Sequence, residues 1–169
     1  MLTLSELTKS TYERAVTPSY RQALGQGGDP ADLRLLEFFD SVYHISQMTL
    51  HSKIVPLFSG FAAEASIPVE VFRNSAKIML HHADLYASLV DPYLDGTRHV
   101  TCLPALQGFG AFVAATVFLA VETFAQRRDD TREKIEIHMK RKRITALKGI
   151  IHLLDKLRQY WKPVQPPVS

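Results

Sequence analysis

The chain has 169 residues, of which 46% are hydrophobic and 22% charged, and its formal net charge is +3. This length and composition exclude a compositionally disordered chain and predict one domain that is large enough to bury a core. The single cysteine, Cys102, excludes an internal disulfide and a cysteine-rich zinc cluster, and it favours an intracellular, reducing compartment.

The first two predicted elements are helices joined by a loop. The first helix covers about residues 4–16 and is followed by a glycine-rich loop at 17–28. Asp29 has the residue type of an N-cap, and Pro30 suits the first position of the second helix. Apolar residues at steps of three and four continue this helix towards Ile54.

Three further helices are predicted, and no strand. The third starts at Pro68 and ends at Asp91, because the residue before a proline (here Pro92) avoids helical geometry. The fourth covers about residues 104–126. The fifth begins near Thr131, behind a capping box formed by Asp130 and Glu133, and continues to about residue 161.

Residues 100–121 carry no charged side chain, which is typical of either a membrane span or the central helix of a soluble domain. Its glycines and alanines dilute the hydrophobicity and form ridges of small residues, at Gly110 and Ala114 for example, that let another helix approach closely. The other helices have apolar stripes that can cover it. We therefore expect an all-α fold, an irregular bundle of about five helices around a hydrophobic central helix, with a membrane span at 100–121 as the alternative.

The expected organisation is a short helix and Gly-rich loop at 1–28, a helical domain at 29–162 and a disordered, proline-rich tail at 163–169. Charge is uneven: residues 1–121 have eight basic and eleven acidic side chains, whereas residues 122–169 have twelve and six. The densest basic run, Lys140, Arg141, Lys142 and Arg143, is either a solvated helix face or a candidate patch for nuclear import or phosphate binding.

The histidines do not predict a metal or catalytic site. His44 and His51 are seven residues apart on one helix face, and His82 lies on an apolar face, where a hydrogen-bonded core histidine is expected. No metal-ligand spacing, nucleophile motif or nucleotide-binding loop accompanies them, so the chain is expected to be no enzyme and to need no cofactor or metal. A small all-helical enzyme that uses one of these three histidines is the alternative.

Four aromatic residues are candidates for an interhelical pocket, although helical spacing of aromatics is more typical of core packing. They are Tyr86, Phe109, Phe112 and Trp161.

Several apolar motifs follow one another in a recognisable order. A Leu-His-x-x motif ends one helix at residues 48–53, and an Ala-rich amphipathic helix covers residues 69–90. A Pro-x-x-Gly-Phe-x-x-Phe-like run follows at 103–115, and a Leu-x-x-[Tyr/Leu]-Trp-like motif ends the last helix at 154–161. In this order, over about residues 33–162, the chain resembles the C-terminal half of the regulatory domain, or middle homology region, of fungal zinc-cluster transcription factors.

The resemblance implies a nuclear module that modulates transcriptional activation; a cytoplasmic location is the alternative. Its implied partners are the transcription machinery or other proteins, with a small-molecule effector as a further candidate and no membrane. Members of that family read DNA through a six-cysteine zinc cluster, whereas this chain has one cysteine. Direct sequence-specific DNA binding is therefore not expected of this chain.

Overall fold

The computed structural model describes residues 2–18, 29–55, 67–125 and 135–160, together with the single positions 22 and 58. Within these residues the chain is an all-α bundle without strands, which confirms the predicted fold class. The predicted capping box at 130–133 and the predicted tail at 163–169 lie outside the described residues. The elements are α1 (Leu2–Ala15), α3 (Pro30–Ser52), α5 (Val69–Leu94), the 3₁₀ helix η1 (Val100–Cys102), α6 (Ala105–Ala125) and α7 (Ile135–Tyr160).

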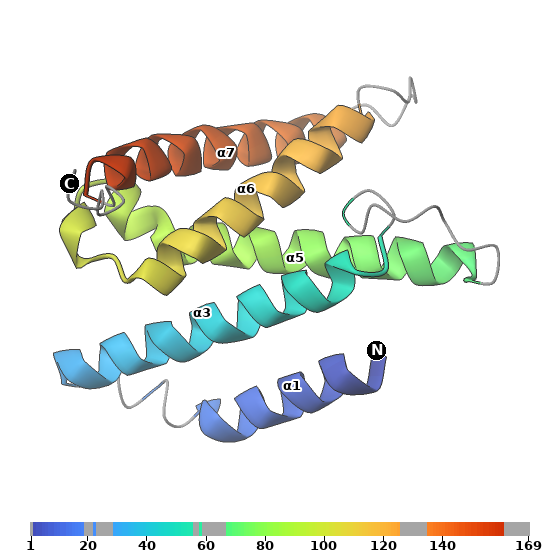
Figure 1. The fold of residues 1–169 in the computed structure, drawn as a ribbon, viewed down its shortest axis with the longest axis horizontal. Helices are drawn as coiled ribbons and strands as arrows, with labels where there is room; N and C mark the ends of the chain where they lie inside the picture. The colour runs from blue at the N-terminus through green and yellow to red at the C-terminus, as the bar shows by residue number, and fades with distance from the viewer. Residues whose placement is uncertain are drawn as a thin grey trace, which may run out of the picture.

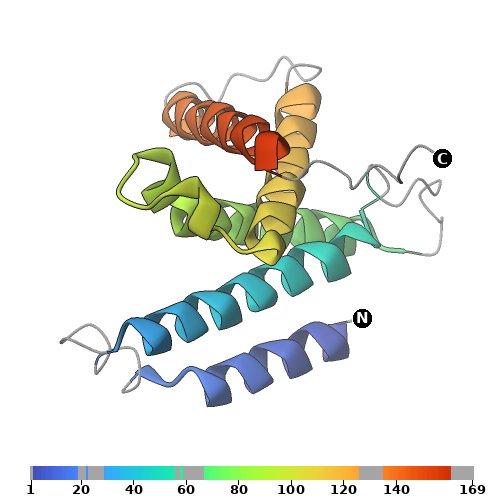
Figure 2. The ribbon, with the colours of Figure 1, turned by 60° about the vertical axis from the view of Figure 1, so that its left-hand side comes forward.

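The helices are arranged in layers with α6 near the centre. Figure 1 shows α3 lying along α5, while α6 crosses diagonally between α5 and α7. α1 packs on α3 and, as Figure 2 shows, lies on the side of α3 that faces away from α6 and α7. α6 therefore contacts three helices, α3, α5 and α7.

The start of α3 is fixed by local chemistry, as the sequence predicts. A side-chain oxygen of Asp29 accepts a hydrogen bond from the backbone N–H of Ala31 at 2.8 Å, and Pro30 occupies the first helical position. This cap satisfies one of the amide groups that a helix start leaves without an intrahelical partner.

The predicted end of α5 at Asp91 is wrong, because the helix continues through Pro92 to Leu94. Pro92 lies in the last turn, so its missing N–H removes only one helical hydrogen bond. The turn that follows supplies replacements: the Pro92 carbonyl accepts hydrogen bonds from the Arg98 N–H at 2.8 Å and from the Thr97 hydroxyl at 3.0 Å. The final carbonyls are thus satisfied without ending the helix at Asp91.

The core forms where α6 approaches α5 closely. Tyr86 of α5 is completely buried, and Gly110 of α6 lies directly against its ring. A Cβ atom at position 110 would lie 2.3 Å from the Tyr86 Cζ atom, so only glycine fits there. Ala111 and Ala114 are also fully buried, which confirms that the small residues of α6 form its packing ridge.

The opposite face of α6 is not covered, contrary to the expectation that neighbouring helices hide the whole apolar run. Phe109, Phe112 and Leu119 are 50%, 58% and 59% exposed. The physical reason is that the small residues pack inwards, so the large ones on the opposite face point away from all three neighbouring helices. We call the exposed residues at these and the intervening positions (Ala105, Phe109, Phe112, Thr116, Leu119 and Thr123) the α6 outer face.

Candidate functional site

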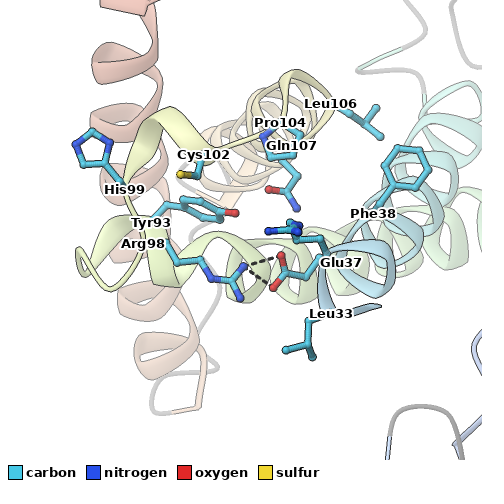
Figure 3. Close-up of a pocket in the computed structure, with 11 residues that line it drawn as sticks. Leu33, Glu37, Phe38, Tyr93, Arg98, His99, Cys102, Pro104, Leu106 and Gln107 are labelled. Carbon is cyan, nitrogen blue, oxygen red and sulfur yellow. Dashed lines mark hydrogen bonds and ion pairs between the residues drawn. The ribbon is translucent and has the colours of Figure 1, made fainter. Parts of the chain in front are cut away.

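A cavity of about 390 Å³ lies where the N-terminal part of α3 meets the connection between α5 and α6. Figure 3 shows side chains from these segments converging on it. Its lining combines apolar side chains with a few polar ones, a composition typical of small-molecule sites. The lining residues are Leu33, Arg34, Glu37 and Phe38 of α3, Tyr93 of α5, Arg98, His99, Cys102 and Pro104 of the connection, and Leu106 and Gln107 of α6.

Gln107 is the buried polar group of this cavity. The residue is 3% exposed, and its side-chain oxygen Oε1 has no hydrogen-bond partner among the described residues. Its backbone carbonyl accepts a hydrogen bond from the Tyr86 hydroxyl at 2.8 Å, which fixes the first turn of α6 against α5. Leaving a buried carbonyl group without a donor costs about 1–3 kcal/mol. The cavity wall therefore holds one acceptor that suits an N–H or O–H donor.

One wall of the cavity is an ion pair. Arg98 donates a hydrogen bond to a carboxylate oxygen of Glu37 at 2.6 Å, as Figure 3 shows, and its guanidinium carbon lies 5.9 Å from the Tyr93 ring centre. Arg34 adds a second guanidinium to the lining. Two arginines against one glutamate give this lining an excess of positive charge.

Sequence reasoning did not single out these polar residues. Glu37 and Arg98 are 61 positions apart, so no local spacing connects them. The signal for Gln107 was an amide inside an otherwise uncharged run of small and apolar residues.

The predicted aromatic pocket is not formed by the described residues. Tyr86 is completely buried, whereas Phe109 and Phe112 are about half exposed, so the structure does not bring the three side chains around one cavity. Trp161 lies outside the described residues. The two phenylalanines follow the outward face of α6 because Gly110 and Ala111 occupy the inward face.

A pair of buried histidines joins α3 to α5. The Nδ1 atoms of His44 and His82 are 2.8 Å apart, so one of them carries the hydrogen and the other accepts it. This confirms the prediction that His82 is a hydrogen-bonded core histidine. Burial lowers the pKa of His82 to about 3, with further lowering by positive charge on His44, His81 and His51.

His51 takes part in a polar contact that ties α1 to α3. The Ser5 hydroxyl donates to the Gln47 side-chain oxygen at 2.6 Å, and the Gln47 amide donates to the Ser5 backbone oxygen at 3.1 Å. His51 Nε2 lies 3.2 Å from the Ser5 hydroxyl oxygen, which leaves Nε2–H as the donor of that contact. A catalytic histidine would instead accept the serine proton. Within the described residues, no group of three or more His, Cys, Asp or Glu side chains is placed to hold a metal ion.

The basic run does not form one uniform surface. Arg141 and Lys142 are exposed, while the side chain of Lys140 lies outside the described part of the chain. Arg143 instead donates from Nε to a carboxylate oxygen of Glu122 at 3.2 Å, and these two side chains are only 13% and 9% exposed. Arg143 thus links α7 to α6.

Replacing Arg143 with alanine is expected to lower the free energy of unfolding by about 2 kcal/mol. This lies between the small effect of an exposed pair and the larger effect of breaking a buried one. Lys142→Ala, in the same turn, should change it by no more than about 0.5 kcal/mol. Urea unfolding measures both values, and equal effects would contradict a structural role for Arg143.

α6 also meets the length and composition criteria of a membrane span over residues Ala105–Thr123, of which half are buried inside the structure. A core helix meets the same criteria. Comparisons of the chain with protein-family models, with curated proteins and with solved structures found no match.

Proposed function

We propose that this chain is a non-catalytic regulatory module of transcription, which acts by binding a helix of a partner protein on the α6 outer face. The observation that carries the proposal is the exposed row of Phe109, Phe112 and Leu119 on a helix whose opposite face forms the core. Proteins rarely leave a contiguous apolar surface exposed unless it binds something.

The spacing of the α6 outer face favours a helix as the bound element. Its six positions from Ala105 to Thr123 follow one another in alternating steps of four and three residues. This spacing keeps a seam on one side of a helix and is the pattern by which two helices pack along each other. The large side chains at 109, 112 and 119 would be the principal contacts.

The contacts of the histidines support a non-catalytic role. His51 donates to Ser5, and His44 and His82 bond to each other, so none of the three is arranged as a base beside a nucleophile. The transcriptional part of the proposal rests on the order of motifs in the sequence, which resembles the regulatory domain of fungal zinc-cluster factors.

A reporter assay tests this function. The chain is fused to a heterologous DNA-binding domain beside an activation domain, and reporter output is compared with that of the same fusion without the chain. We expect the wild-type chain to change output several-fold. Phe112→Glu should abolish the change, because a charge in the seam is costly to bury. Ile151→Glu is the matched control, since Ile151 of α7 is equally exposed (55%) but lies outside the α6 outer face.

Two results would contradict the proposal. One is an unchanged reporter when the wild-type fusion is nuclear and abundant. The other is loss of the effect in the Ile151 control to the same degree as in the Phe112 variant. Carbonate-resistant sedimentation of the wild-type chain with membranes would favour the second candidate, a span over Ala105–Thr123, which the length and apolar composition of α6 support.

A further inference from the structure

We infer that the cavity between α3 and the α5–α6 connection binds an aromatic carboxylic acid that carries a hydroxyl or amide N–H donor. This site is separate from the α6 outer face, so the inference does not depend on the function proposed above.

The donor on the ligand is required by Gln107. Its Oε1 atom is buried, lacks a partner among the described residues and belongs to the cavity lining. In Figure 3 the Gln107 amide points into the space between Tyr93 and Phe38. A ligand N–H or O–H at this point would satisfy the acceptor, and a ligand without one would leave it desolvated.

The body of the ligand is defined by the apolar lining. Phe38 of α3 and Tyr93 of α5 lie on opposite sides of the Gln107 amide in Figure 3, and Leu106 borders the space next to Phe38. Aromatic rings gain additional stabilisation from edge or offset contacts with other rings. A single aromatic ring with a short chain therefore suits this space better than a sugar or a nucleotide does.

The carboxylate is favoured by the charge of the lining. Glu37 is held by Arg98, so the charge of that arginine is already matched. Arg34 adds a guanidinium from the same helix, in the turn before Glu37. A guanidinium binds a carboxylate with paired, charge-assisted hydrogen bonds.

The only cysteine of the chain makes this cavity measurable. Cys102 lines it and is exposed, so its reaction with iodoacetamide, followed by intact-protein mass spectrometry, reports on occupancy. Three probes separate the two polar requirements: hydroxyphenylbutanoate has both groups, phenylbutanoate lacks the donor and hydroxyphenylbutanol lacks the carboxylate. We expect the first to slow Cys102 modification and to bind about tenfold more tightly than either of the others.

Two variants assign each requirement to a residue. Gln107→Met should remove the difference between hydroxyphenylbutanoate and phenylbutanoate, and Arg34→Gln should remove the difference between the acid and the alcohol. Gln107→Met deletes a polar group without a partner, and Arg34 is exposed, so neither change should unfold the chain. Lys142→Gln is the matched control for lost positive charge.

The inference is overturned if none of the probes protects Cys102 or gives heat on titration. It is equally overturned if Gln107→Met still prefers the hydroxylated acid, since the donor would then bind elsewhere. Equal weakening by Lys142→Gln and Arg34→Gln would show that only the net charge matters.

Discussion

Replacing Gly110 with alanine is expected to lower the free energy of unfolding by about 3 kcal/mol or more. In an ordinary helix interior the same change would stabilise the protein by about 1 kcal/mol. Here the new Cβ would lie 2.3 Å from both Cζ and the hydroxyl oxygen of Tyr86. That ring is completely buried and its hydroxyl is bonded to the Gln107 carbonyl, so it has no free direction in which to move. Guanidinium unfolding followed by circular dichroism measures the loss.

Gly149→Ala is the matched control for this substitution. A Cβ at position 149 would lie 2.9 Å from one terminal methyl group of Leu94, and a flexible leucine can turn away. The expected change is within about 1 kcal/mol. Combining Gly110→Ala with Tyr86→Leu should recover part of the lost stability, because leucine lacks the far end of the ring. A Gly110→Ala protein as stable as the wild type would show that α5 and α6 do not pack as described.

Acidification from pH 6.5 to about pH 3 is expected to destabilise the protein through His82. The folded state keeps His82 neutral, because burial and the nearby histidines lower its pKa to about 3. In the unfolded chain the pKa is about 6.5. Between these values the unfolded state binds the extra proton, so the free energy of unfolding falls as the pH falls. At about 1.4 kcal/mol for each pH unit, the full effect is on the order of 4 kcal/mol.

The variant His82→Gln isolates this contribution from that of the carboxylates. Glutamine does not titrate and can still hydrogen-bond with His44, so the variant should lose much less stability than the wild type over the same pH range. His152→Gln removes an exposed histidine and should keep the wild-type profile. Parallel pH profiles of the wild type and His82→Gln would show that His82 titrates normally in the folded state.

The positions of the helices could be predicted where local chemistry decides them. Asp29 and Pro30 fix the start of α3 by a cap that needs no distant partner. The end of α5 could not be predicted in this way, because continuation past Pro92 depends on hydrogen bonds from Thr97 and Arg98 in the following turn. A proline in a sequence indicates the lost amide and not the groups that compensate for it.

The exposed face of α6 and the cavity depend on tertiary contacts that one sequence does not show. The apolar run predicts a helix but contains no polar stripe that would mark its outer side, so Phe109 and Phe112 were expected inside the fold. The cavity joins Glu37 to Arg98 across 61 positions, and only the packing of α3 on the α5–α6 connection brings them together. By contrast, the apolar periodicity around His82 was sufficient to predict a core histidine.

The contact between Tyr86 and Gly110 also constrains how this chain can evolve. As long as a tyrosine occupies position 86, purifying selection should remove every side chain at position 110, including alanine. A lineage that first acquires a smaller residue at 86 would release position 110 to drift, and the original tyrosine could not then return without a second change. The two sites should therefore change together and in a fixed historical order, although 24 positions separate them along the chain.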